Sequence, residues 1–295
     1  MPESAPIERN LGLELVRVTE AAALAAGRWL GRGDKNGSDG AAVTAMREAL
    51  AGIEMDGMVV IGEGEKDEAP MLYIGEKIGN GQPPAVDIAV DPVDGTRLLS
   101  LGMPGAIAVV ALGERGSMYS APPGVFYMEK IIVGAAAKGS IDIEASVAKN
   151  IAWVSRALGR ERGDITVMVL DRPRHEGLIN EIRATGARVR LIHDGDVMGA
   201  ITAAEEGTGV DMLMGTGGAP EAVVAACAIK AMGGDMQCRL SFRNEDERKN
   251  TIASGVDVNA VLNIDDLARG EDLFFAATGI TDGGLLKGVR YLRDG

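Results

Sequence analysis

Residues 164–192 read DITVMVLDRPRHEGLINEIRATGARVRLI, and this stretch decides the fold. The β-branched, apolar residues at 164–171 predict a strand, and the next segment predicts a helix that opens near Pro173 and closes near Gly186. Residues 187–192 predict a second strand. A strand, a helix and a strand in succession indicate a βαβ unit, whose two strands lie parallel in one sheet.

The same alternation continues along the chain. Residues 194–206 predict a helix capped near Asp194 or Asp196, residues 210–215 predict a strand, and residues 219–233 predict an apolar helix. Such regular alternation is typical of α/β proteins with a parallel sheet.

The chain before residue 160 has longer β stretches and fewer helices, which indicates α+β layering. Its pattern predicts helices over 10–30, 40–52 and 144–158, a loop over 31–40, a strand and acidic loop over 57–65, and strands near 86–90, 105–112 and 131–136. Asp39 is the expected N-cap of the second helix.

These patterns predict an α/β protein of two domains. We expect an α+β domain over 1–160 and a βαβ domain over 161–240. Residues 274–284 predict a late strand and turn, so we expect the segment 241–295 to return to the first domain.

Composition excludes several classes of protein. The 295-residue chain is 46% hydrophobic but only 3% aromatic, which predicts a full aliphatic core. Its two cysteines, Cys227 and Cys238, are too few for a disulfide framework and fit a reducing cytosol. No apolar run reaches the roughly 18 residues of a membrane helix. The formal net charge of −13 argues against a nucleic-acid partner, and an anionic substrate would depend on local cations or metal.

The segment AVDIAVDPVDGT, residues 85–96, reads as a buried strand that ends in two acids, Asp91 and Asp94. Two carboxylates on one turn offer hard cations the oxygen ligands that they prefer, and Thr96 is placed to hold a water there. The alternative is a solvated turn, because Asp-Pro and Asp-Gly pairs are ordinary turn formers.

Two further acids stand at loop or helix-start positions. Glu63 follows a predicted strand in a glycine-flanked loop, whereas the acids at 65–68 read as solvated surface. Glu221 falls in the first turn of a predicted helix, where it either faces a ligand or only complements the helix dipole. Gly215 and Gly217 also resemble half of a dinucleotide-binding fingerprint, which by itself is a weak match.

Together these motifs resemble the metal-dependent sugar and inositol phosphatase superfamily, and more specifically class II fructose-1,6-bisphosphatases. The matching stretches cover nearly the whole chain in family order: GRGDKNGSDGAAVTAMR (31–47), VVIGEGEKDEAPMLYIGE (59–76), DIAVDPVDGT (87–96), FYMEK (126–130), LDRPRH (170–175), DGDV (194–197), GGAPE (217–221), GGDMQ (233–237) and FFAATGITDGGLLKG (274–288). The resemblance implies a layered αβαβα fold with a metal-binding first domain and a substrate-binding second domain.

The resemblance also implies roles for the matching residues. The metal ligands, for Mn²⁺ or Mg²⁺, match Asp39, Glu63, Asp91, Asp94 and Glu221. The catalytic positions match Thr96, which orients the attacking water, together with Lys35, Asp39 and Glu63. The substrate contacts match Asp94, Gly95, Thr96, Tyr127, Arg172, Pro173, Arg174, Asp194, Gly195, Asp196 and Gly218. Arginine forks bind phosphate bidentately, which supplies positive charge that the chain lacks overall.

The chain departs from the family pattern in two places. Family members more often carry Glu at the position of Asp94, so we expect a metal ligand there with slightly changed geometry. They also usually continue with a further strand beyond the position of Gly295, which bears on stability and assembly more than on the chemistry.

The resemblance implies a hydrolase that removes the 1-phosphate of D-fructose 1,6-bisphosphate in gluconeogenesis. It implies a cytoplasmic homo-oligomer, a dimer or tetramer, whose partner is a small sugar bisphosphate rather than nucleic acid or membrane. The alternatives are a dual fructose-1,6-/sedoheptulose-1,7-bisphosphatase of the reductive pentose phosphate cycle, an inositol-monophosphatase-like enzyme, and a non-catalytic sensor of metal and sugar phosphate. Arg172 and Arg174 favour a bisphosphate over a monophosphate.

Overall fold

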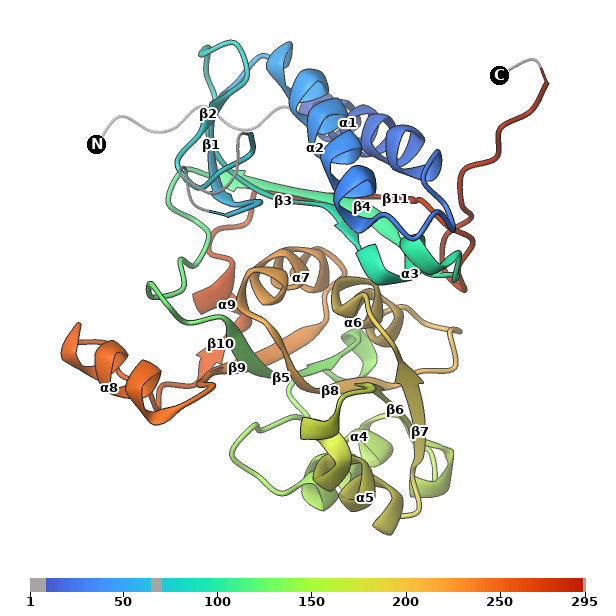
Figure 1. Ribbon diagram of the computed structural model, residues 1–295. Coiled ribbons are helices and arrows are strands. Elements are labelled where there is room, and N and C mark those ends of the chain that lie inside the picture. Colours follow the sequence, from blue (N-terminus) through green and yellow to red (C-terminus); the bar gives the residue numbers. More distant parts are fainter. Residues whose placement is uncertain (1–8, 65–70, 294–295) are drawn as a thin grey trace. The chain divides into compact units, whose positions relative to one another are not determined.

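The computed structural model describes residues 9–64 and 71–293. The chain forms two compact units, and each has a sheet and helices of its own (Figure 1). The first unit comprises Met1–Met118 with Gly270–Gly295, and the second comprises Tyr119–Arg269. The predicted α/β class, with an α+β first part and a βαβ unit in the second part, is confirmed.

The first unit is built on a five-stranded sheet in the order β11-β4-β3-β1-β2. Strand β1 is parallel to β3, and the other neighbours are antiparallel. The strands are β1 (Asp56–Ile61), β2 (Lys77–Ile78), β3 (Ala85–Asp94), β4 (Ile107–Glu114) and β11 (Leu273–Gly279). Strand β11 pairs with β4 along its whole length, so the predicted return of the late strand to the first part is confirmed.

The described part of this unit has the helices α1 (Arg9–Gly27), α2 (Lys35–Ala51) and α3 (Thr96–Leu101). Helices α1 and α2 pack together on one face of the sheet (Figure 1). Their apolar residues, such as Leu15 and Met46, share a core with Val90 of β3 and Val110 of β4. Side chains alternate along a strand, so the residue after Val90, which is Asp91, points to the opposite face.

Helix α2 begins earlier than predicted. Its N-cap is Asp34, whose side chain accepts a hydrogen bond of 2.8 Å from the N–H of Gly37. The expected N-cap, Asp39, lies inside the helix instead. Glycine is a poor helix former, and this hid the first turn in the sequence pattern. Gly37 is needed for packing, because a Cβ there would lie 2.4 Å from the ring of Trp29.

The second unit is built on a six-stranded sheet in the order β10-β9-β5-β8-β6-β7. Its strands are β5 (Tyr127–Val133), β6 (Thr166–Leu170), β7 (Arg188–Ile192), β8 (Met212–Gly218), β9 (Asp235–Ser241) and β10 (Leu262–Asn263). Strand β6 is parallel to β7 and β8, but β5, β9 and β10 join antiparallel. The prediction of a parallel sheet is therefore right for three strands and wrong for the rest.

The helices of this unit are α4 (Val147–Ala157), α5 (Glu176–Ala184), α6 (Asp196–Ala204), α7 (Ala219–Ala231), α8 (Glu245–Ala253) and α9 (Ile264–Leu267), with 3₁₀ turns at Ala135–Ala137, Arg162–Asp164 and Pro173–His175. Helices α6 and α7 cover one face of the sheet, and α4 and α5 cover the other (Figure 1). The N-cap of α6 is Gly195, between the two predicted cap residues, and no side chain caps the helix, so neither Asp194 nor Asp196 has the capping role.

The two units meet along the chain at 118/119 and 269/270, whereas the predicted domains met at 160/161 and 240/241. The difference comes largely from β5 and α4, which precede residue 160. Strand β5 pairs with β8 and β9 in the second sheet. An apolar run shows that a strand is buried but does not show which sheet it joins.

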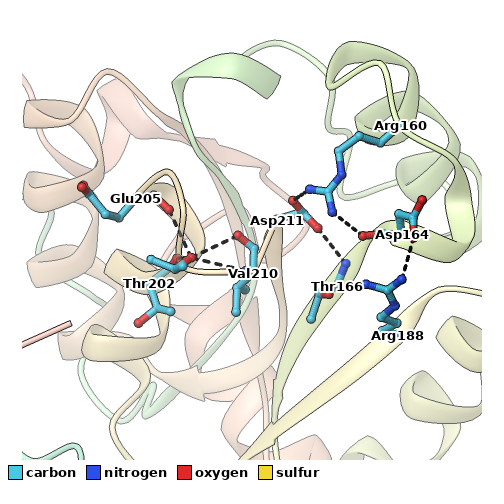
Figure 2. A network of polar contacts seen from close by, with 9 residues as sticks. Arg160, Asp164, Thr166, Arg188, Thr202, Glu205, Val210 and Asp211 are labelled. Atoms are coloured by element: carbon cyan, nitrogen blue, oxygen red, sulfur yellow. Dashed lines mark hydrogen bonds and ion pairs between the residues drawn. The ribbon is translucent and has the colours of Figure 1, made fainter. Parts of the chain in front are cut away.

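Polar contacts hold the amino ends of β6, β7 and β8 (Figure 2). Arg160 pairs with Asp211, whose other oxygen accepts a hydrogen bond of 2.8 Å from the N–H of Thr166. Arg160 also donates to the carbonyl of Asp164 at 2.6 Å, and Arg188 pairs with the Asp164 carboxylate at 2.5 Å. These contacts fix one edge of the parallel strands and leave the carboxyl edge for other residues.

Two further observations bear on the exclusions made from composition. No helix within residues 9–64 or 71–293 is long and apolar enough to cross a membrane. Cys227 and Cys238 are both buried free thiols, and burial raises the pKa of each to about 12. Neither thiol is therefore a reactive nucleophile.

Candidate active site

The end of strand β3 carries Asp91 and Asp94. Asp91 pairs with Val109 of β4 and Asp94 pairs with Ile107, so three steps on β3 oppose two steps on β4 in a β-bulge. Val109 and Ile107 share one face of the sheet, so their partners share that face too. The bulge therefore brings both aspartates to the face opposite α1 and α2, which a regular strand would not do.

The turn after β3 presents Thr96. Gly95 adopts a left-handed φ of 90° as the N-cap of α3, a conformation that favours glycine. Thr96 is half-buried, and its Oγ1 donates a hydrogen bond of 3.0 Å to the carbonyl of Val93. Because that bond uses the hydroxyl hydrogen, the lone pairs of Oγ1 are left to accept a hydrogen from water or substrate.

Asp39 of α2 lies beside Glu63, which follows β1. The two carboxyl groups share a hydrogen bond; burial raises the pKa of Asp39, and the bond to Glu63 opposes that rise. Two neighbouring carboxyl groups repel each other when both are ionised, and a bound divalent cation would relieve that repulsion.

The backbone of Glu63 is firmly held. Its N–H donates to the carbonyl of Leu72 at 2.9 Å, and a Cβ on the preceding Gly62 would lie 2.0 Å from the same oxygen. The N–H of Leu72 is bound in turn by the buried carboxylate of Glu76, which also pairs with Arg47 at 2.5 Å. Only glycine fits before Glu63, and the predicted glycine-flanked loop is thus a packed turn.

Lys35 is the first residue of α2 and is exposed. It precedes Asp39 by four residues, so the two side chains lie on the same face of the helix. The acids at 65–68, which read as solvated surface, lie outside the described residues.

The four predicted metal ligands of the first unit stand in two pairs. Asp39 lies beside Glu63, and Asp91 shares a strand face with Asp94. Within the described ranges, no group of three or more His, Cys, Asp or Glu side chains forms a ready-made metal site. Both pairs offer oxygen donors, which suit Mg²⁺ and Mn²⁺ better than softer metals. The donor chemistry therefore fits a hard divalent cation.

In the second unit, the carboxyl ends of β6, β7 and β8 lie at one edge of the sheet because the three strands are parallel. Arg172–Arg174 follow β6, Asp194–Asp196 follow β7, and Gly218 ends β8. Tyr127 begins the antiparallel strand β5 and pairs with Gly218 at the same edge. The structure thus brings together the predicted substrate contacts of this unit.

The two arginines differ in their surroundings. Arg172 pairs with the carboxylate of Asp194 at 3.3 Å. Arg174 donates to the carbonyl of Thr216 from Nε at 3.2 Å and from Nη2 at 2.7 Å, and its guanidinium lies 5.2 Å from the ring centroid of Tyr127. Among the described residues, no carboxylate pairs with Arg174. Its exposed charge remains available for an anion.

His175 is buried behind these arginines. Its Nδ1 lies 2.7 Å from the carbonyl of Leu170, and its Nε2 accepts a hydrogen bond of 2.8 Å from the N–H of Thr216. A carbonyl can only accept, so Nδ1 carries the hydrogen and the ring is neutral. Burial is the main cause that lowers the pKa of His175 below its ordinary value. The residue has a structural role, since its two ring nitrogens join the end of β6 to β8.

Glu221 is the third residue of α7 and folds back over the N-cap Gly218. Burial raises the pKa of Glu221; nearby Asp196 raises it further, and Lys130 opposes both. Its Oε2 is fully enclosed and meets no hydrogen-bond donor among the described residues. An orphaned carboxylate oxygen fits a missing ligand better than a partner of the helix dipole alone.

Lys130 was not identified from the sequence. It is buried in the central strand β5, and its Nζ contacts the carboxylate of Asp196 at 2.5 Å and the carbonyl of Gly218 at 3.1 Å. Burial lowers the pKa of Lys130, but the charges of Asp196 and Glu221 outweigh it and the net shift is upward. A lysine inside the apolar run MEKIIV, residues 128–133, was the signal that could have revealed it.

The glycines before α7 are explained by packing. A Cβ would lie 3.1 Å from the ring of His175 at Gly215, 2.0 Å from Oδ2 of Asp196 at Gly217, and 1.8 Å from Oε2 of Glu221 at Gly218. The turn therefore makes room for side chains of this chain. The half-match to a dinucleotide fingerprint needs no nucleotide to explain it.

Residues 9–295 match the protein family described as "Bacterial fructose-1,6-bisphosphatase, glpX-encoded". The chain belongs to this family. It is 50% identical to the fructose-1,6-bisphosphatase class 2 of Haemophilus influenzae over 296 aligned residues, which cover 96% of this chain and 88% of that protein. It is 49% identical, with the same coverage, to the fructose-1,6-bisphosphatase 1 class 2 of Escherichia coli K12 and to a class 2 enzyme of Escherichia coli O6:H1.

Membership in the glpX-type fructose-1,6-bisphosphatase family confirms the predicted family and function. It also confirms the predicted enzyme class, a phosphoric monoester hydrolase. The family match covers residues 9–295 and therefore spans both compact units. It includes the candidate metal-binding acids of the first unit and the segment Arg172–Arg174 of the second.

Within this fructose-1,6-bisphosphatase, the predicted site residues fall into two sets. Asp39, Glu63, Asp91, Asp94 and Thr96 belong to the first unit. Glu221 belongs to the second unit, with the predicted substrate contacts outside β3 and its turn. Glu221 neighbours Lys130 and Asp196 there, which links a predicted metal ligand to a predicted substrate contact.

Proposed function

We propose that this glpX-type enzyme removes the 1-phosphate of D-fructose 1,6-bisphosphate with the help of Mn²⁺ or Mg²⁺. The products are fructose 6-phosphate and phosphate, and the reaction serves gluconeogenesis. The observation that carries the proposal is the pair Asp91 and Asp94, which a bulge brings to one strand face beside Thr96. Like charges on one face repel, and a cation between them removes the repulsion.

From the family resemblance we assign metal ligation to Asp39, Glu63, Asp91 and Asp94 of the first unit and to Glu221 of the second. A bound divalent cation would neutralise the scissile phosphate and make a water more acidic. Two features support this assignment. Asp39 and Glu63 are neighbouring carboxyl groups, and Oε2 of Glu221 is enclosed with no donor among the described residues.

Thr96 orients the attacking water in this proposal. Its Oγ1 gives its hydrogen to the Val93 carbonyl, so towards a water it acts as an acceptor. A water that donates to Thr96 keeps a lone pair for the phosphorus atom. Lys35 stabilises negative charge on the phosphoryl oxygens. We assign to Asp39 or Glu63, as an ionised carboxylate, the acceptance of the proton that the attacking water gives up.

The second unit anchors the part of the substrate that does not react. Arg174 is exposed and without a carboxylate partner among the described residues, so we assign the remote phosphate to it. Tyr127, Asp194, Asp196 and Gly218 surround the same sheet edge and are assigned to the sugar. Binding energy at the remote phosphate helps to position the reacting phosphate.

Phosphate release from three substrates tests the proposal. Fructose 1,6-bisphosphate, sedoheptulose 1,7-bisphosphate and inositol 1-phosphate are compared with Mn²⁺, with Mg²⁺ and with EDTA. We expect metal-dependent release, fastest from fructose 1,6-bisphosphate, with fructose 6-phosphate as the product. Unchanged release in EDTA, or release from inositol 1-phosphate alone, contradicts the proposal. Faster release from the sedoheptulose ester assigns the enzyme to the reductive pentose phosphate cycle instead.

The assembly and the location of the enzyme complete the proposal. From the family resemblance we infer a cytoplasmic homo-oligomer, either a dimer or a tetramer. Light scattering coupled to size-exclusion chromatography measures the oligomer size directly. A monomer at working concentration contradicts this part and leaves the assigned chemistry in place.

A further inference from the structure

Strand β5 places a lysine where a buried strand ordinarily carries an apolar residue. Lys130 stands between Met128 and Ile132 on the face covered by α6 and α7, and its side chain is 2% exposed. Lysine is almost never fully buried unless it is paired, because its charge must leave water. The contacts of its ammonium therefore explain why a lysine can occupy this buried position.

The sheet around Lys130 is built from small residues. Its cross-strand neighbours are Gly215 on β8 and Cys238 on β9. A Cβ on Gly217 would lie 3.0 Å from Nζ of Lys130 and 2.0 Å from Oδ2 of Asp196. The long side chain fills the space left by these residues and extends to the carboxyl edge of the sheet.

At this edge the ammonium holds two groups together. Nζ contacts Oδ2 of Asp196 at 2.5 Å and the carbonyl of Gly218 at 3.1 Å. Asp196 is the first residue of α6 and Gly218 is the last of β8, so one cation joins a helix start to a strand end. Both belong to the proposed substrate contacts.

We propose that Lys130 is a positioning residue for the substrate: its buried ammonium orients the Asp196 carboxylate towards the sugar hydroxyls. The inference rests on the proposed function, because Asp196 enters that function as a sugar contact. Lys130 itself does not touch the substrate. It acts through Asp196. The hydrogen bond from Nζ to the carbonyl of Gly218 fixes the position of the ammonium.

The second unit offers a matched control at its opposite edge. Arg160 pairs there with Asp211, whose side chain is 8% exposed, close to the 10% of Asp196. Arg160 and Asp211 both lie outside the strands, Asp211 just before β8, whereas Lys130 of β5 reaches Asp196 at the carboxyl edge. Replacing either cation would lower the stability of the unit. Only the replacement of Lys130 would change substrate binding.

The test compares Lys130→Met, Asp196→Asn, the double variant and Arg160→Met in full-length enzyme. Steady-state kinetics with fructose 1,6-bisphosphate, calorimetric binding of that ester and melting temperatures are measured. We expect Lys130→Met and Asp196→Asn each to raise KM about 10-fold or more, with kcat within about 3-fold of the parent. The double variant should bind no worse than Asp196→Asn, because two residues that act as one unit are not additive. Arg160→Met should lower the melting temperature and keep KM.

The other possible results contradict either the inference about Lys130 or the proposed function as well. An unchanged KM in folded Lys130→Met, or an equal rise of KM in Arg160→Met, overturns the inference while the proposed function stands. A parent enzyme that neither binds nor hydrolyses the ester overturns both. If Lys130→Met does not fold, the double variant carries the test, since it also removes the Asp196 charge with which Lys130 pairs. A double variant clearly weaker than Asp196→Asn then overturns the inference.

Discussion

Gly218 shows how a missing side chain can shape a site. Its backbone, with φ of −63° and ψ of 144°, is ordinary extended geometry that any residue can adopt. Glycine is needed because the carboxylate of Glu221 occupies the space of a Cβ, with Oε2 1.8 Å from it. Position 218 therefore fixes where a proposed metal ligand points.

Gly218→Ala should displace Glu221 with little loss of stability. We expect Mn²⁺ affinity to fall about 10-fold or more, as when a metal ligand loses its support, with only a small shift in melting temperature. A manganese titration followed by electron paramagnetic resonance measures the affinity. Parent-like affinity in the folded variant would show that Glu221 does not bind the metal.

His175, at the end of the turn Pro173–His175, makes the stability of the fold depend on pH. Its folded pKa lies below the ordinary value, mainly because the ring is buried, so the unfolded chain binds the proton more readily. The stability contributed by the neutral ring is present above about pH 6.5 and is lost as pH falls below it. Protonation would also leave the N–H of Thr216 without its acceptor.

Replacing His175 with Gln should flatten this pH dependence. At neutral pH the loss of one buried hydrogen bond should cost about 1–3 kcal/mol. Between about pH 7.5 and about pH 5.5, the parent should lose more unfolding free energy than His175→Gln. Urea unfolding at both pH values measures the difference. Equal losses in the two proteins would mean that another group controls the acid sensitivity.

At the scale of elements, local signals were predicted well and pairings were not. Residues 164–192 form β6, α5 and β7 as predicted, because each element has its own periodicity and turn residues. The start of α2 was missed, since Gly37 packs on Trp29 against its low helix propensity. The partners of β5 were missed because strand pairing depends on residues far away along the chain.

The candidate site shows the same difference between local sequence signals and long-range pairing. The acids at 91 and 94 were identified from their turn, yet the bulge that brings them to one face is a property of the β3–β4 register. Lys130 was missed because one charge inside an apolar run reads as noise until its partner, Asp196, is placed by α6. Residue types in a turn can thus mark candidate site residues, whereas their geometry depends on strand pairing with distant residues.

The contacts at the amino edge of the second sheet should contribute stability alone. Arg160→Met leaves Asp211, which is largely buried, without its cation. We expect the unfolding free energy to fall by about 1–3 kcal/mol, discounted because Arg160 is 41% exposed. Urea unfolding measures the loss and hydrolysis measures turnover. A variant with parent stability but impaired turnover would reverse this assignment.

At the scale of the whole molecule, the net charge of −13 opposes an anionic substrate, so local cations must hold it. Arg174→Met should weaken turnover of fructose 1,6-bisphosphate about 10-fold to 100-fold in kcat/KM, since a charged hydrogen bond to phosphate is lost. Fructose 1-phosphate lacks the remote phosphate and serves as the control. An equal loss on both esters would place Arg174 at the reacting phosphate instead.

The central claim is that Asp91 and Asp94 are tolerated together because they hold a metal. Asp87 provides the matched control: it lies on the same strand face, but it accepts a hydrogen bond of 2.7 Å from Gly116 and pairs with Arg115 at 3.4 Å. These contacts join β3 to the turn after β4, so the same substitution at Asp87 should affect stability rather than chemistry.

The most direct measurement is therefore Mn²⁺-dependent hydrolysis of fructose 1,6-bisphosphate by Asp91→Asn, beside the parent and Asp87→Asn. We predict that Asp91→Asn folds and melts near the parent temperature but loses at least about 100-fold in kcat/KM. Asp87→Asn should melt earlier and keep parent-like turnover. Normal metal-dependent turnover by Asp91→Asn would contradict the account.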